Sequence, residues 1–161
     1  MTRRRPGRSS KRVVLPRPAR ELIFPRMARF LVKTEPSTYS FADLVRDRKT
    51  VWDGVSNPVA LKNLATIRKG DTVVVYHTGD EKQAVGLAIA ASDAYADPKL
   101  NDPKRWVVDL SPDKPLKTPV TLAQVKADAT LKTNDLARLP RLSVIPFTEV
   151  QYQRLLKLAG A

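Results

Sequence analysis

The chain of 161 residues contains no cysteine and a single histidine, His77. Without thiols it can form neither a disulfide framework nor a thiolate zinc site, and one imidazole excludes metal sites built on several histidines. No apolar run reaches the roughly 20 residues that a membrane-spanning helix needs. These absences predict a cytoplasmic protein without a metal, a cofactor or a membrane partner.

Most catalytic signatures are also missing. The sequence has no Gly-x-Ser-x-Gly elbow and no glycine-rich phosphate loop. Lys33, Thr34 and Glu35 place an amine, a hydroxyl and a carboxylate together at a predicted strand end. Because successive side chains of a strand point to opposite faces, these three meet only if the backbone turns, as Pro36 would allow. The sequence therefore predicts a non-catalytic protein, with catalysis as the minority alternative.

Acidic residues are scarce, at 16 against 29 Lys and Arg, so the net charge is +13. Residues 1–26 hold nine cations and one acid (+8), and residues 27–161 hold twenty and fifteen (+5). A basic balance favours polyanions such as nucleic acid through counterion release.

The leader at 1–26 has too few apolar residues to fold, so we expect it to be disordered. A basic arm for nucleic acid, an organellar transit peptide, and a leader absent from the mature protein all remain open. We favour the last, with Met27 as the true start.

Residues 27–161 predict one α+β domain. Capping boxes begin at Ser40, Thr121 and Thr148, and Asn57 precedes a proline at a first helical position. We expect helices over 41–47, from Pro58 to Lys69, after Thr121 and after Thr148. We expect strands over 30–32, 72–77, 84–91 and 106–110, and a short strand before the last helix.

The strand at 72–77 is nearly continuous in β-branched residues, as in a strand buried on both faces. Gly86 marks a bulge or a close backbone approach. Because repeated βαβ units are missing, a curved and largely antiparallel sheet fits better than a doubly wound one.

The aromatic residues supply a candidate pocket. Trp52 runs into the turn Asp53-Gly54, and base stacking on an aromatic ring is worth about 1–3 kcal/mol. The alternative is a core tryptophan, the usual fate of so large an apolar ring. For Trp106, on an alternating strand, we favour core or sheet packing. Asn57 either caps a helix or reads a base edge, and His77 ends a buried strand.

From Phe30 to the last helix, the chain resembles the EVE domain, a PUA-like barrel related in fold to ASCH and YTH domains. Each matching piece is short, but together they cover about 130 residues in order. The matching pieces are Leu31-Val32-Lys33-Thr34-Glu35-Pro36 with Tyr39-Ser40, Trp52-Asp53-Gly54-Val55 with Asn57, Lys69-Gly70-Asp71, Tyr76-His77-Thr78, Val85-Gly86-Leu87-Ala88, Tyr95-Ala96-Asp97-Pro98, and Arg141-Leu142-Ser143-Val144 with Pro146.

The resemblance implies a mixed, mostly antiparallel barrel of five to six strands with peripheral helices. It also implies a pocket for a flipped and modified base, such as a C5-modified cytosine, in DNA or RNA. The pocket positions that match the family's motifs are Lys33, Thr34, Trp52, Asn57, Tyr76, His77 and Ser143. We expect Lys62, Arg68 and Arg141 to contact phosphates.

Many members carry an arginine and an aromatic residue around this asparagine. The chain has Ser56 and Pro58 instead, which implies a less basic and less aromatic rim. The alternative function is a small hydrolase of modified nucleosides, as among ASCH-like relatives, and it would depend on Lys33 and Glu35. A pure protein-interaction module is a third possibility. We favour a monomeric nucleic-acid-binding domain.

Overall fold

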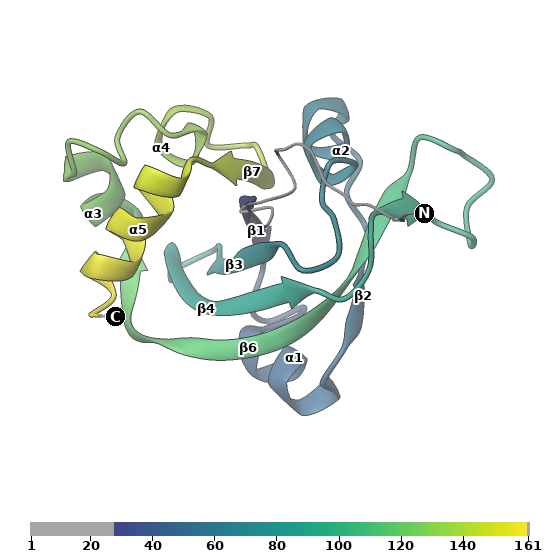
Figure 1. Ribbon diagram of the computed structural model, residues 1–161, viewed down its shortest axis with the longest axis horizontal. Helices are drawn as coiled ribbons and strands as arrows, with labels where there is room; N and C mark the ends of the chain where they lie inside the picture. Colours follow the sequence, from purple (N-terminus) through teal and green to yellow (C-terminus); the bar gives the residue numbers. More distant parts are fainter. Residues whose placement is uncertain (1–27, 161) are drawn as a thin grey trace, which may run out of the picture.

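The computed structural model describes residues 28–160, so the leader predicted over 1–26 lies outside the described residues. Strands and helices are mixed along the chain (Figure 1). The strands are β1 (Arg29–Thr34), β2 (Thr50–Trp52), β3 (Thr72–His77), β4 (Gln83–Ala90), β5 (Tyr95–Ala96), β6 (Trp106–Thr121) and β7 (Val144–Phe147). The helices are α1 (Phe41–Asp47), α2 (Pro58–Leu64), α3 (Leu122–Ala127), α4 (Asp135–Arg138) and α5 (Glu149–Leu158).

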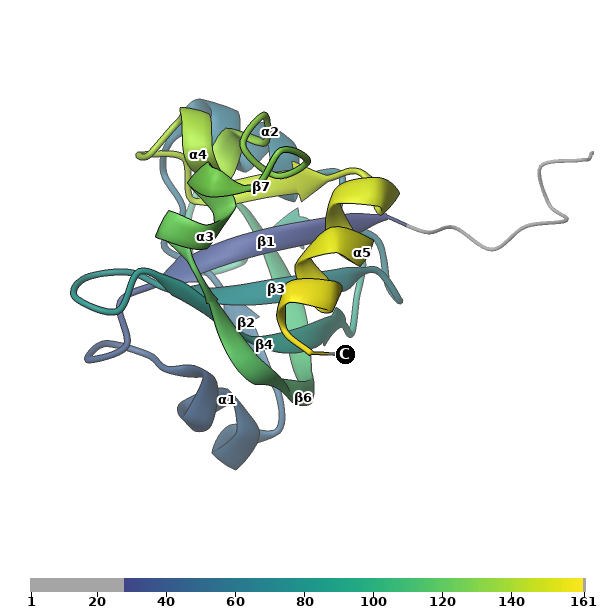
Figure 2. The same ribbon diagram turned by 90° about the vertical axis from the view of Figure 1, so that its left-hand side faces the viewer.

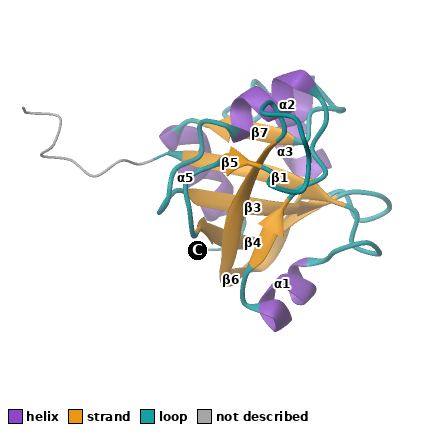
Figure 3. Cartoon of the chain, turned by 90° about the vertical axis from the view of Figure 1, so that its right-hand side faces the viewer, coloured by secondary structure: helices purple, strands orange, loops and turns teal. Residues whose placement is uncertain are grey.

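The strands form one curled sheet in the order β2-β6-β4-β3-β1-β7, and β5 pairs with β6 outside this path. The β1–β3 pair is parallel, and the other described pairs are antiparallel. The helices lie around the sheet (Figure 3). This is the predicted PUA-like barrel architecture with peripheral helices. The described sheet has one strand more than the five to six expected, and β5 is only two residues long.

Three of the predicted helix starts are confirmed by their caps. Ser40, Thr121 and Thr148 each form a complete capping box, in which the side chain accepts from a backbone N–H three residues on. Asn57 Oδ1 accepts from Val59 N–H and Ala60 N–H, and so caps α2. These local side-chain bonds place the helices where the sequence predicted them.

The predicted end of α2 at Lys69 is wrong, because the helix ends at Leu64. The backbone then closes into shorter turns, in which Thr66 N–H donates to Asn63 O and Ile67 N–H donates to Leu64 O. The Thr66 hydroxyl also donates to Asn63 O, at 2.7 Å. A side chain that bonds back to the helix backbone competes with continued helix.

The predicted end of the strand at 106–110 is also wrong, because β6 continues past Leu110 to Thr121. Pro112, Pro115 and Pro119 make this extension unusual, since proline has no N–H for the ladder. The β4–β6 pairing shifts register twice, and each proline lies at or between these shifts. The bulges let a strand rich in proline continue along the whole edge of β4.

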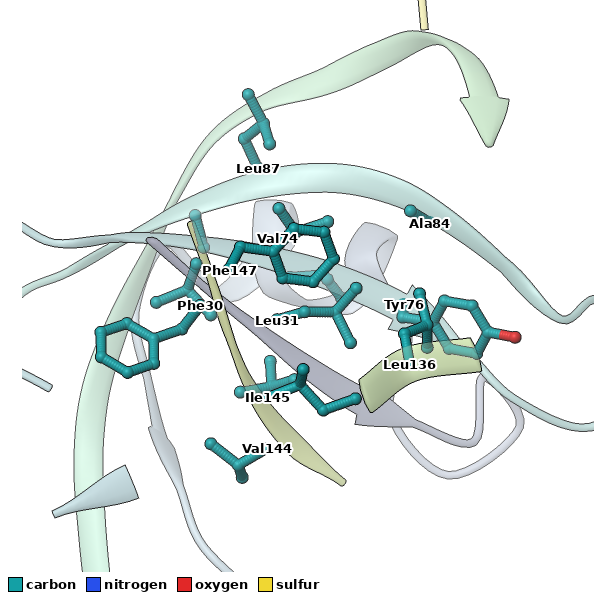
Figure 4. Packing of buried hydrophobic residues seen from close by; sticks show 14 of the residues in the cluster. Phe30, Leu31, Val74, Tyr76, Ala84, Leu87, Leu136, Val144, Ile145 and Phe147 are labelled. Carbon is teal, nitrogen blue, oxygen red and sulfur yellow. The ribbon is translucent and has the colours of Figure 1, made fainter. Parts of the chain in front are cut away.

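The two faces of the paired β1 and β3 bury different side chains. Leu31 and Val74 face the side of α3, α4 and α5, where they pack with Ile145 and Leu136 (Figure 4). The opposite face is covered by α1, which lies far from α2, α3 and α4 (Figure 2). No helix of residues 28–160 is both long and apolar enough to span a membrane.

Gly86 lies where α1 approaches β4. A Cβ at this position would lie 2.5 Å from ring atoms of Phe41. The ladder between β3 and β4 shifts register between Val75 and Tyr76, opposite the segment from Ala84 to Gly86. Of the two alternatives predicted for Gly86, the bulge is present, and the close neighbour is the Phe41 ring and not another backbone segment.

Candidate nucleic-acid interface

The predicted pocket residues on β1 and β3 separate onto two faces of the sheet. Lys33 pairs with Tyr76, and Thr34 pairs with His77 at the next position. Since side chains alternate along a strand, these two pairs point in opposite directions. The structure therefore does not bring the four side chains into one pocket.

Thr34 and His77 hold the segment that leads from β1 into α1. Thr34 Oγ1 donates to Tyr39 O at 2.6 Å. His77 Nε2 accepts from Phe41 N–H at 3.0 Å, and His77 Nδ1 lies 2.9 Å from Glu81 Oε1. A nitrogen that accepts a backbone N–H carries no proton, so Nδ1 is the donor to the carboxylate. Both side chains are engaged in bonds that shape this segment.

Trp52 lies against the same segment, with its ring edge-on to Tyr39 at 6.2 Å between centroids. Its side chain is 8% exposed and belongs to the hydrophobic core cluster. It lines none of the three hollows described below. The indole of Trp52 therefore does not face an open cavity. The alternative interpretation, a tryptophan packed in the core, matches the structure.

Lys33 and Tyr76 line a hollow of about 300 Å³, which we call the lysine hollow. Lys33 Nζ donates to Pro140 O at 2.9 Å and lies 5.7 Å from the Tyr76 ring centroid. Burial lowers the pKa of Lys33 and raises that of Tyr76. The other lining residues are Thr78, Gly79, Lys82, Leu122, Lys126, Leu136 and Pro140.

A second hollow, of about 330 Å³, lies between the start of α2 and residues 139–142. We call it the central hollow. Its walls are mostly apolar, and the side chains of Val59 and Leu139 are 54% and 44% exposed there. Asn57 and Arg141 supply its polar groups. Asn57 uses Oδ1 as the cap of α2, which leaves its Nδ2 amide as a donor.

Ser143 comes directly after Leu142, which lines the central hollow, and is half-buried. Its carbonyl accepts from Lys33 N–H at 3.0 Å, which ties this segment to the end of β1. Pro140 lines both the lysine hollow and the central hollow, so the two adjoin.

The third and largest hollow, about 680 Å³, lies on the other side of residues 56–59. We call it the tryptophan hollow, because Trp106 lines it. This indole also packs against the core, as expected, but it is only half-buried. This open side was not predicted from the sequence. Lys104 and Arg105, which directly precede the tryptophan, were the available signal. The remaining lining residues are Ser56, Pro58, Leu61, Lys62, Ala65, Thr66 and Asp102.

The segments that line the three hollows, namely α3, α4, residues 139–142, α2 and the loop before β6, follow one another along one side of the molecule (Figure 1). We call the lining of the three hollows together the basic strip. Its lining contains one carboxylate, Asp102, which lies 4.0 Å from Arg105. Of the predicted phosphate contacts, Lys62 and Arg141 line the strip and Arg68 does not. The cations that line it are Lys33, Lys62, Lys82, Lys104, Arg105, Lys126 and Arg141.

The described part of the chain has no group of three or more His, Asp or Glu side chains that could hold a metal ion. Glu35, which the hydrolase alternative would use, is exposed, and its Oε1 accepts from Ser37 N–H and Ser37 Oγ. These two hydrogen bonds lower the pKa of Glu35.

The curled, mostly antiparallel sheet with peripheral helices is the architecture of a PUA-like domain, and the family follows from comparison with known proteins. The family model described as EVE domain matches residues 28–158. The chain therefore belongs to the EVE domain family. No curated protein matches it.

Several solved structures are similar to most of the chain. A protein of Rhodopseudomonas palustris is 40% identical, with 83% of this chain and 94% of that chain covered and a TM-score of 0.79. The human THYN1 protein, solved in complex with 5-methylcytosine-containing DNA, is 26% identical, with 83% and 98% covered and a TM-score of 0.76. An ASCH protein of Zymomonas mobilis, at 14% identity, 81% and 94% coverage and a TM-score of 0.53, shows similarity of fold alone.

Proposed function

We propose that this protein is a non-catalytic nucleic-acid-binding domain that recognises a flipped, modified base, such as a C5-modified cytosine. The human relative solved with 5-methylcytosine-containing DNA supports the ligand class. In this proposal, the central hollow receives the base and the basic strip holds the strand on either side. The cytoplasmic location and the monomeric state expected from the sequence stay predictions.

The observation that carries this proposal is the charge of the basic strip. Seven cationic side chains and a single carboxylate line its three hollows. Outside the leader, the protein has only a modest excess of basic charge, so the strip concentrates it on one surface. A stripe of Lys and Arg along one face is the electrostatic footprint of a nucleic-acid-binding protein.

The central hollow has the chemistry that a C5-modified pyrimidine requires. Asn57 Nδ2 and the Arg141 guanidinium can donate to the oxygen and nitrogen acceptors of a cytosine edge. Val59 and Leu139 offer apolar surface that a methyl group at C5 would cover. Unstacking a base costs a few kcal/mol, which these contacts and the phosphate contacts would have to offset.

Trp52 packs in the core beside Tyr39 and lines neither the central hollow nor the lysine hollow, so it does not contact the base in this proposal. Thr34 and His77 contribute by fixing the segment from 35 to 41 on which Trp52 packs. We propose that these three side chains stabilise the fold and do not touch the base. Lys33 and Tyr76 belong to the adjoining lysine hollow.

The test is a titration of oligonucleotides that differ only in one cytosine or 5-methylcytosine, as DNA and as RNA, at two salt concentrations. The variant is Asn57→Ser, which keeps an oxygen for the cap of α2 but removes the amide donor. We expect tighter binding of the modified strand and a loss of that preference in Asn57→Ser. Arg138→Ala is the control, because Arg138 is exposed, pairs with Asp135 and lies outside the hollows. Equal affinity of the unaltered protein for both strands would refute the proposal.

The observations give less support to the hydrolase alternative. Lys33 and Thr34 point to opposite faces of β1, and Glu35 is bonded to Ser37. A nucleophile and its base must lie within hydrogen-bond reach. Incubation with substituted cytidines followed by chromatography tests this alternative directly, since turnover would show product and a binding domain would not.

A further inference from the structure

The lysine hollow contains a buried hydroxyl without a partner. Tyr76 is 3% exposed, and its hydroxyl makes no hydrogen bond to any described residue. Desolvation is the only cause of its raised pKa, with no hydrogen bond contributing. The hydroxyl lies at the end of the ring that points away from the packed core (Figure 4). Since buried polar groups in native proteins are nearly always bonded, this one calls for a ligand or water.

The ammonium group of Lys33 stands beside the same ring and is also incompletely bonded. Among the described residues it donates one hydrogen bond, to Pro140 O, although an ammonium group has three donors. The burial that lowers the pKa of Lys33 means that its cationic form lacks full solvation there. An anion in the hollow would restore this solvation.

The other charged residues that line the lysine hollow also favour an anion. Lys82 and Lys126 add two exposed cations, and no carboxylate lines the hollow. The neighbouring Glu81 carboxylate is turned to His77 and Gln83 instead. The hollow therefore presents three ammonium groups and a tyrosine hydroxyl to one volume of about 300 Å³.

We propose that the lysine hollow binds a phosphate group, with Tyr76 and Lys33 as direct donors and Lys82 and Lys126 at the rim. The assignment to a backbone phosphate next to the base in the central hollow rests on the proposed function, because Pro140 joins the two hollows. The binding of a phosphate group in the lysine hollow does not itself depend on the proposed function. Lysine and tyrosine donors serve this chemistry because a phosphate accepts several charge-assisted hydrogen bonds.

The test compares the full chain with Tyr76→Phe, which removes only the hydroxyl and keeps the ring that Lys33 approaches. Binding of inorganic phosphate and of the oligonucleotides above is measured for both proteins. We expect Tyr76→Phe to weaken both by about 10-fold, as for the loss of one hydrogen bond to a charged group. Lys126→Gln should weaken both as well. Tyr152→Phe is the matched control, because Tyr152 is a buried tyrosine on α5 beneath Arg29.

Two further readouts separate the possible outcomes. Thermal unfolding of Tyr76→Phe should be unchanged or raised, because the hydroxyl it loses has no partner. Its preference for 5-methylcytosine should also be unchanged, because the base hollow is intact. Loss of phosphate binding without loss of oligonucleotide binding would assign the hollow to free phosphate and refute the backbone role. Unaltered affinity for both ligands in Tyr76→Phe would overturn the proposal, whereas loss of base preference alone would count against the central hollow.

Discussion

The backbone N–H of Phe41 donates to Nε2 of His77, across 36 positions of sequence. This bond joins the end of β3 to the first residue of α1, at the point where a helix has N–H groups without partners. The imidazole thus serves as a structural acceptor inside the fold and is not presented to a ligand.

We predict that His77→Ala destabilises the protein, because Phe41 N–H would be left buried without an acceptor. Such a loss costs about 1–3 kcal/mol, and chemical denaturation measures it. His77→Gln should recover much of the lost stability, since an amide oxygen can replace Nε2 as the acceptor. Affinity for oligonucleotides should stay constant in His77→Gln. A large loss of affinity at native stability would assign His77 to the binding surface instead.

The two tryptophans should differ in accessibility. Trp52 is buried and Trp106 is half-buried and lines the tryptophan hollow. We predict that acrylamide quenches the fluorescence of Trp52→Phe, which reports Trp106, more than that of Trp106→Phe. Added oligonucleotide should protect Trp106, because the basic strip passes over it.

Removal of Trp52 has a different expected effect. Trp52→Ala should destabilise the fold by about 3–5 kcal/mol, as large core truncations do. Trp52→Phe is therefore the variant for binding measurements, and its unfolding must be followed in parallel. If Trp52 were quenched more than Trp106, the burial described above would be wrong.

Local chemistry explains why much of the fold could be predicted from the sequence. The start of α1 was predicted correctly because Ser40 and Asp43 form their capping box within four residues. The strand at 72–77 was also correct, since its side chains are buried on both faces. The continuation of β6 could not be predicted, because the bulges that accommodate its prolines arise from pairing with β4.

The candidate site was harder to predict, because it depends on which side chains share a face. Lys33 and Tyr76 meet because β1 and β3 pair in parallel with this register, and the sequence of neither strand specifies it. The burial of Trp52 likewise depends on Tyr39 and on the pairing of β2 with β6. A turn next to a tryptophan in the sequence does not show whether the side chain of that tryptophan is buried or exposed in the fold.

Gly86 provides a test of the packing between α1 and the sheet. A Cβ there would lie 2.5 Å from the Phe41 ring, closer than side chains tolerate. We predict that Gly86→Ala destabilises the protein by about 1–3 kcal/mol, as overpacking does. In the background of Phe41→Leu, which removes ring atoms, the same change should cost less. A double-mutant cycle in urea measures this coupling, and additive costs would show that the ring does not limit the site.

The last prediction concerns the pH dependence of binding at the lysine hollow. Burial lowers the pKa of Lys33, and a bound phosphate favours its ammonium form, so binding raises that pKa again. As the pH rises through the lowered pKa, the free protein loses this proton and oligonucleotide affinity should fall. The other titratable groups that face the hollow are Tyr76, whose pKa is raised by burial, Lys82 and Lys126.

Lys33→Arg should remove this fall in affinity with rising pH, because a guanidinium keeps its charge. Affinities of the unaltered protein and of the variant for the same oligonucleotide are compared at each pH, so that titration of the ligand cancels in their ratio. Lys126→Arg serves as the control at an exposed lysine of the same hollow, and its affinity should still fall as the pH rises. If Lys33→Arg and the unaltered protein gave parallel profiles, the Lys33 ammonium would not contact the phosphate.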